Sequence, residues 1–290
     1  SDAAYGLILT TLCAIILKKY KPEGTTHRMI KMFMFCGLST FMWGALFGGW
    51  FGNFFTVAAK TFFGKEFVIK PLWFDPLSEP MKLLVVSLIL GAIHLFVGMG
   101  VQAYMDIKDG RPLDALFDIG LWYLLLIGIV LFAFGGKLGA GAVGIGKIMA
   151  IIGAVGILLT GGRKKKGIFG KLTGGLGSLY GITSYLSDVL SYSRLLALGL
   201  ATGVVAQVFN TLGSLAGGGI AGSVLLIVVF AFGTVFNIAI NALGAFVHSC
   251  RLQYVEFFGK FYTGGGRPFA PFERKTKYIK ILKEGNDNVK

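Results

Sequence analysis

Two arginines, Arg194 and Arg251, lie deep inside long apolar stretches of the sequence. The other 26 of the 28 lysines and arginines lie at or beyond the ends of such stretches. A guanidinium at the centre of a bilayer costs from about 3 to more than 10 kcal/mol, and arginine cannot avoid this cost by losing its proton. A buried ion pair with an acid would explain one such residue. Two of them, on neighbouring apolar stretches, favour an ion-transport site.

Serines follow the face of the predicted helix that carries Arg194. At 100° per residue, Ser187, Ser191 and Ser184 lie about 20°, 60° and 80° from Arg194 around the helix axis. All three precede Arg194, on the side that we expect to be cytosolic. Past Arg194 the same face turns apolar, for example at Leu198. This stripe predicts a polar half-path that opens to the cytosol only.

The last apolar stretch shows the opposite pattern around Arg251. Asn237, His248 and Asn241 lie about 40°, 60° and 80° from Arg251, all on the side expected to be outside. Two opposed stripes that meet at two arginines predict two half-channels without a continuous leak. The alternative explanation is ordinary hydrogen bonding between helices, which polar residues in membrane spans commonly make.

Two acids lie away from these faces. Asp188 is about 120° from Arg194, and Glu256 is about 140° from Arg251. We group Asp188 with the cytosolic half-channel and assign Glu256 a structural role, although either acid could brace a neighbouring helix.

Membrane-spanning helices are the elements that position these residues. Of the 290 residues, 54% are hydrophobic and 14% charged, against about 25% charged in soluble domains, and the mean hydropathy is +0.72. Because about 20 apolar residues span a bilayer as a helix, we expect an all-α polytopic membrane bundle whose last two helices are long and tilted. All seven prolines lie outside the predicted spans, which favours unbroken helices. The predicted spans are 3–18, 30–55, 83–104, 115–134, 142–161, 171–213 and 222–262, within a transmembrane domain 1–272 that a tail, 273–290, follows.

The connecting segments divide unevenly in charge, with 20 lysines and arginines in one set and six in the other. Cytosolic loops are the richer in these residues, so we expect residue 1 outside and the tail in the cytosol. The richer segments are 18–31, 105–114, 162–171 and 259–290, and the poorer ones are 56–82 and 135–147.

Other chemistries are disfavoured. A glycine-rich turn, Gly141 to Lys147, imitates a phosphate-binding loop but has Ile148 where Ser or Thr is needed. The three cysteines have no metal-ligand spacing, and the net charge of +14 reflects membrane orientation rather than nucleic-acid binding. We therefore expect no cofactor, no metal, no nucleic-acid partner and no ATP-hydrolysing site.

Three further polar features lie outside the two stripes. His94 is expected to form a hydrogen bond with a neighbouring helix, and the basic run 163–166 is expected to mark the cytosolic side. Asp118 has no assigned role.

Four segments resemble a known family. The segment 191–201, SYSRLLALGLA, resembles the arginine helix of subunit a, or I, the membrane stator of V-type and A-type rotary ATPases. Residues 248–262 resemble that subunit's last helix, 264–272 its terminal cytosolic motif, and 1–6 the link between its first two helices. The resemblance is specific over 184–272 and looser elsewhere, and the short loops are similar to those of bacterial or archaeal members.

The resemblance implies an eight-helix domain, of which this chain lacks the first helix and the N-terminal cytosolic arm. It implies that Arg194 and Arg251 face a rotating ring of c or K proteolipids and displace H⁺ or Na⁺ from its carboxylates. Asp2 matches an acid near the outer channel, whereas Asn241 replaces a glutamate of eukaryotic members. The implied partners are the ring, the peripheral stalks, a membrane subunit on the central-stalk side and the bilayer, which in a prokaryote is the plasma membrane.

Two other classes remain open. A self-contained secondary transporter would have helices interrupted near mid-membrane, often in symmetric halves. A purely structural membrane anchor would not need embedded arginines.

Overall fold

The computed structural model describes residues 2–63, 69–137, 139–163, 168–215, 219–267, 269 and 271–272, which form helices and connecting segments without any strand. The predicted tail 273–290 and Lys164 to Lys166 of the basic run lie outside these residues. In chain order the elements are α1 (Ala3–Tyr20), α2 (Gly24–Phe47), α3 (Phe54–Phe63), α4 (Pro80–Lys108), α5 (Pro112–Ala115), the π-helical turn η1 (Leu116–Gly120), α6 (Leu121–Phe134), the 3₁₀ turn η2 (Gly135–Lys137), α7 (Ala140–Thr160), α8 (Ile168–Tyr180), α9 (Ile182–Leu190), α10 (Ser193–Ser214), α11 (Ile220–Arg251), the π-helical turn η3 (Leu252–Phe257) and the 3₁₀ turn η4 (Phe258–Lys260).

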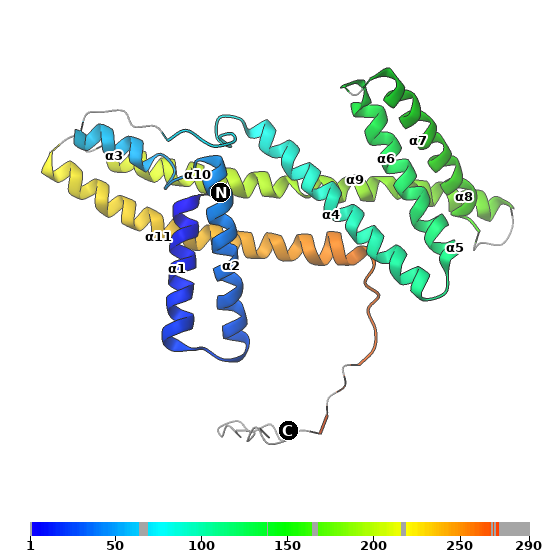
Figure 1. The fold of residues 1–290 in the computed structure, drawn as a ribbon, viewed down its shortest axis with the longest axis horizontal. Coiled ribbons are helices and arrows are strands. Elements are labelled where there is room, and N and C mark those ends of the chain that lie inside the picture. Colours follow the sequence, from blue (N-terminus) through cyan, green and yellow to red (C-terminus); the bar gives the residue numbers. More distant parts are fainter. Residues whose placement is uncertain are drawn as a thin grey trace, which may run out of the picture.

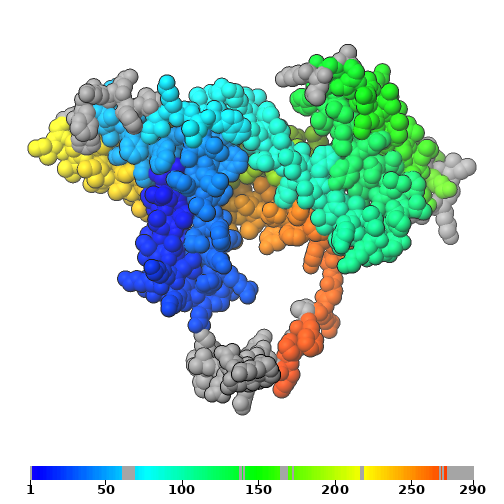
Figure 2. Space-filling view, viewed as in Figure 1, coloured from blue at the N-terminus to red at the C-terminus, as the bar shows by residue number. Residues whose placement is uncertain are grey.

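Two helical hairpins are joined by long helices that run across them. Figure 1 shows α1 and α2 side by side on one side of α4, and α6 and α7 side by side on the other. The line of α8, α9 and α10 crosses both hairpins, and α11 packs along α10. In the space-filling view the two hairpins form separate lobes (Figure 2). The crossing helices α10 and α11 carry the two arginines.

Small residues allow the helices of each hairpin to approach closely. A Cβ atom added at Gly44 of α2 would lie 2.1 Å from the Ala3 nitrogen of α1. One added at Gly128 of α6 would lie 2.5 Å from the Ala150 nitrogen of α7. Both distances are far below van der Waals contact, so only glycine fits at these crossings.

The predicted architecture is confirmed. Among the described residues, seven helical stretches are long and apolar enough to span a membrane. They are Ala3–Tyr20, Gly24–Phe47, Pro80–Lys108, Pro112–Phe134, Gly141–Thr160, Phe169–Ser214 and Ile220–Lys260. The prediction that the second span reaches residue 55 is wrong, because Gly48 ends α2 in a left-handed conformation at φ 71°. The short helix α3, which follows this turn, was not predicted.

The apolar stretch predicted over 171–213 is one helical span, Phe169–Ser214. Its regular α-helical hydrogen bonding is interrupted at Gly181 and at Ser191–Tyr192, without any proline, which was not predicted. At the second interruption the N–H groups of Tyr192, Arg194 and Leu195 donate to carbonyls only three residues back, which tightens the turn toward 3₁₀ geometry. These are tightened turns rather than unwound segments, so the described part of the chain lacks the broken helices expected of a secondary transporter.

Candidate functional site

A cavity of about 690 Å³ lies between α1, α2 and α4 on one side and α10 and α11 on the other. Most of its lining is apolar. Its polar lining residues include a group contributed by the start of α1 and by α10 and α11. These residues are Asp2, Tyr5, Thr202, Asn237 and Asn241.

Three of these residues form a hydrogen-bonded cluster between α10 and α11. Asn237 is only 1% exposed, and its Nδ2 donates to the Thr202 carbonyl at 3.1 Å. Asn241 Nδ2 donates to the Asn237 carbonyl at 2.8 Å, and the Thr202 hydroxyl donates to Asn241 Oδ1 at 3.0 Å. The structure thus brings Asn237 and Asn241 together with a residue that the sequence reasoning missed. At 100° per residue Thr202 lies about 80° from Arg194. Ser184 has the same offset and was included in the polar stripe, so the same criterion could have identified Thr202.

Asp2 lines the same cavity and is 2% exposed. Its Oδ1 caps α1 by accepting the N–H groups of Ala4 at 3.0 Å and Tyr5 at 3.3 Å. Its Oδ2 accepts the Gly52 N–H at 2.8 Å. These backbone donors satisfy both oxygens of the buried Asp2 carboxylate.

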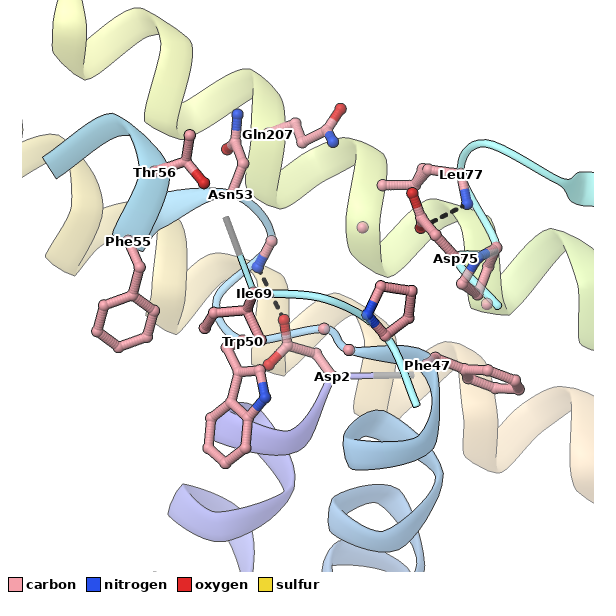
Figure 3. Close-up of a pocket in the computed structure, with 17 residues that line it drawn as sticks. Asp2, Phe47, Trp50, Asn53, Phe55, Thr56, Ile69, Asp75, Leu77 and Gln207 are labelled. Atoms are coloured by element: carbon pink, nitrogen blue, oxygen red, sulfur yellow. Dashed lines mark hydrogen bonds between the residues drawn. The ribbon is translucent and has the colours of Figure 1, made fainter. Parts of the chain in front are cut away.

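Asp2 also lines a second, more polar cavity of about 220 Å³ (Figure 3). Asn53, Asp75 and Gln207 contribute to its walls, which come from the segments on either side of α3 and from α10. Asp2 therefore lines both cavities, and the smaller one lies under the segments that are predicted to be outside.

Arg194 lies in the second position of α10 and forms an ion pair with η3. Its Nη1 is 3.4 Å from Glu256 Oε1, and its side chain is 21% exposed. Glu256 is 3% exposed, and its Oε2 has no hydrogen-bond partner among the described residues. From the sequence we assigned Glu256 a structural role. In the structure Glu256 contacts Arg194, one of the two arginines of the proposed ion-transport site.

Arg251 ends α11 and has a different environment. It is exposed on the surface of the chain, and the described part of the structure gives it no ion pair. His248 is half-buried. Neither of them lines either cavity, although Asn237 and Asn241 on the same helix line the larger one.

The residues assigned to the cytosolic half-channel line neither of the two cavities. Ser184 and Ser187 are exposed on α9, and Ser191 is half-buried at the interruption before α10. Asp188 forms an ion pair with Lys260 of η4, so this acid joins two elements. Ser184 and Ser187 consequently lie on an exposed surface of the chain.

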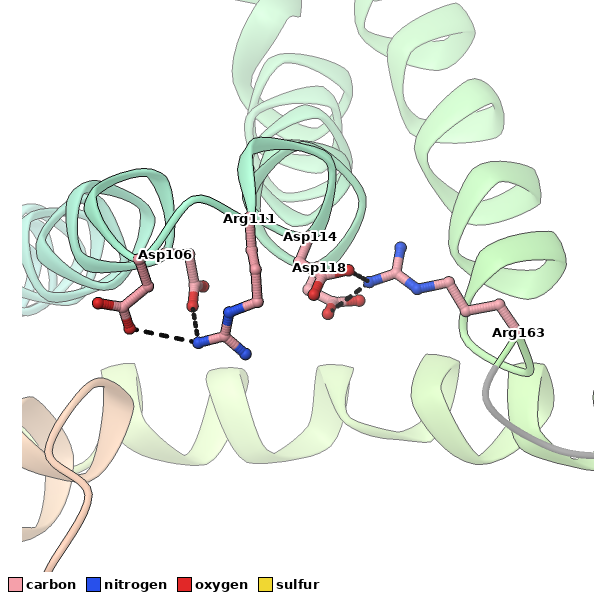
Figure 4. Close-up of polar contacts among 6 residues, drawn as sticks. Asp106, Arg111, Asp114, Asp118 and Arg163 are labelled. Carbon is pink, nitrogen blue, oxygen red and sulfur yellow. Dashed lines mark hydrogen bonds and ion pairs between the residues drawn. The ribbon is translucent and has the colours of Figure 1, made fainter.

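Two further polar contacts support the frame around these helices. His94 of α4 hydrogen-bonds the hydroxyl of Tyr192, which confirms the expected helix–helix bond and adds a residue that the sequence did not single out. Arg163 pairs with Asp114 at 2.6 Å and with Asp118 at 2.8 Å (Figure 4). Asp118, which had no assigned role, thereby joins the end of α7 to the start of the α5–α6 span.

Comparison with known proteins gives one consistent result. Residues 182–274 match the V-type ATPase 116kDa subunit family. The A-type ATP synthase subunit I of Methanocaldococcus jannaschii is 34% identical over 309 residues, covering 96% of this chain and 43% of that protein. That of Pyrococcus horikoshii is 36% identical over 293 residues, covering 97% and 41%. The V-type ATP synthase subunit I of Chlamydia trachomatis is 23% identical over 332 residues, covering 94% and 49%. The chain spans less than half the length of these curated relatives.

Proposed function

Because the chain belongs to the family of subunit I of A-type and V-type ATP synthases, we propose that it provides the stator's ion path in such a rotary complex. In this proposal Arg194 and Arg251 face a ring of proteolipids, each of which carries a carboxylate that binds H⁺ or Na⁺. The chain itself hydrolyses no ATP and needs no cofactor.

The exposure of Arg251 carries this proposal. Arg251 lies within the apolar stretch Ile220–Lys260, is exposed on the surface of the chain, and has no ion pair among the described residues. A permanent cation in a membrane span requires an anion or water. A ring carboxylate that approaches this surface from outside the chain would supply the anion. Arg194, one-fifth exposed, could meet the same carboxylate.

The two half-channels follow from the polar residues on either side of the arginines. The outer one runs through Asp2, Asn237 and Asn241, with Thr202 added to them, and His248 continues it along α11. The cytosolic one comprises Ser184, Ser187, Ser191 and Asp188. Since Ser184 and Ser187 lie on an exposed surface, the ring would form the opposite wall of this half-channel.

The remaining parts of the assembly are proposed from the family. Peripheral stalk subunits would bind the N-terminal cytosolic arm that the family resemblance implies, and a membrane subunit would lie on the central-stalk side. The complex would reside in a prokaryotic plasma membrane, with the C-terminus of this chain in the cytosol.

Arg194→Ala tests the proposal directly. In vesicles that contain the assembled complex, we expect this substitution to abolish ATP-driven H⁺ or Na⁺ uptake without preventing assembly. Arg194→Lys should also fail largely, because an ammonium cannot reproduce the planar guanidinium. Arg163→Ala is the matched control, since it removes an arginine that pairs with two acids away from both cavities. Normal uptake by Arg194→Ala vesicles would refute the proposal.

A further inference from the structure

The ion pair between Arg194 and Glu256 rests on a single long contact. The Nη1–Oε1 distance is 3.4 Å, whereas charge-assisted N–H···O bonds usually measure about 2.7–2.9 Å. The other oxygen of Glu256 is buried and has no hydrogen-bond partner in the described part of the chain. Leaving a buried acceptor without a partner is unfavourable. A carboxylate that served only to brace two helices would be expected to satisfy both oxygens.

A local departure from α-helical geometry accompanies this contact. Residues 252–257 form a π-helical turn, in which the Phe258 N–H donates to the Gln253 carbonyl five residues back. Such turns insert a residue into the helix and occur frequently at functional sites. In a regular helix Glu256 would lie about 140° from Arg251. The π turn changes this offset, because its hydrogen bonds join residues five apart rather than four.

Arg194 retains donors for a second anion. A guanidinium has five N–H donors, and only Nη1 contacts an acid of the described chain. One-fifth of the side chain remains exposed. Arg194 can therefore hold Glu256 on its inner side and accept a carboxylate from outside the chain on its outer side.

We propose that Glu256 competes with the ring carboxylate for Arg194. This inference rests on the proposed function. While the facing ring carboxylate carries its ion and is neutral, Glu256 supplies the counter-charge that Arg194 needs within the membrane. When that carboxylate has released its ion, it binds the outer side of Arg194 and weakens the contact with Glu256. Glu256 remains beside the guanidinium and can pair with it again. An incoming ion can therefore displace Arg194 from the ring carboxylate and bind that carboxylate. Glu256 is thus a positioning residue that keeps Arg194 from holding the ring too tightly.

Glu256→Gln tests this role, since it removes the charge with little change in shape. ATP-driven transport is measured in vesicles that contain the assembled complex. In one series the Na⁺ concentration is varied at fixed pH, and in a second series the pH is varied at fixed Na⁺ concentration. We expect the half-saturating concentration of the transported ion to rise at least about fivefold, the lower end of coupling between linked sites. Transport at saturating ion should largely recover. Glu256→Asp, which keeps the charge but shortens its reach, should give an intermediate value.

Asp114→Asn is the matched control, because it removes an acid from another arginine pair of the same chain. It should leave the half-saturating ion concentration unchanged. If Glu256→Gln lowers the amount of assembled complex or the maximal rate but leaves the half-saturating concentration unchanged or reduced, Glu256 is only a brace and the inference is wrong. Failure of the proposed function would be seen separately, as transport that survives Arg194→Ala.

Discussion

Substitution of Asn237 tests whether this residue only stabilises the contact between α10 and α11 or also contributes to the ion path. Asn237→Leu nearly preserves volume but removes the amide that donates to the Thr202 carbonyl and the acceptor that Asn241 uses. Hydrogen bonds between membrane helices contribute about 0.6 kcal/mol on average and at most about 1.7 kcal/mol. Two such bonds predict a loss of roughly 1–2 kcal/mol in stability. Transport should fall much further, because leucine would replace the most buried polar side chain of the proposed outer half-channel.

Asn210→Leu is the appropriate control for this experiment. Asn210 is also a buried asparagine, at 3% exposure, and its Nδ2 donates to Phe51 O at 2.9 Å and to Asn53 Oδ1 at 3.0 Å. It lines neither cavity. Both variants should lower the thermal midpoint of the purified complex by similar amounts, while only Asn237→Leu should reduce ATP-driven ion uptake severely. Equal transport in the two variants would refute a path through the Thr202–Asn237–Asn241 cluster.

Two further predictions address packing and orientation. Gly128→Leu should destabilise the complex by about 1–3 kcal/mol, because α6 and α7 must separate to admit the side chain. Gly177→Leu on α8, where an added Cβ meets nothing within 4 Å, should have little effect on the thermal midpoint. In a variant without native cysteines, a membrane-impermeant thiol reagent added outside should label a cysteine placed at the exposed Trp73 and spare one at Lys165. The reverse labelling would invert the assignment of both half-channels.

The fold was largely predictable because the membrane imposes one strong constraint. A span must be apolar and must satisfy its own backbone hydrogen bonds, so hydropathy alone located all seven helical stretches. What it missed depends on local backbone geometry. The turn at Gly48 and the short helix α3 lie in an apolar, aromatic-rich segment, so hydropathy did not distinguish them from a continuing span.

The site was predictable in composition but less so in its contacts. The offsets along α11 hold because residues 237–251 form one regular helix. The offsets between the serines and Arg194 cross the interruption at Ser191–Tyr192, where 100° per residue no longer applies. Glu256, which contacts Arg194, lies in the π turn after Arg251, and this turn has no proline or other sequence signal. Both features arise from backbone hydrogen bonds rather than from side-chain type.

The arrangement around the larger cavity explains how the proposed outer half-channel could avoid a leak. Leu195, which follows Arg194, and Cys250, which precedes Arg251, both line this cavity, whereas neither arginine does. The cytosolic serines line neither cavity. On the proposed function, an ion in the outer cavity would therefore have to leave that cavity to reach the serines of the cytosolic half-channel. It could cross only on a ring carboxylate that moves past the arginines, so transport would require rotation.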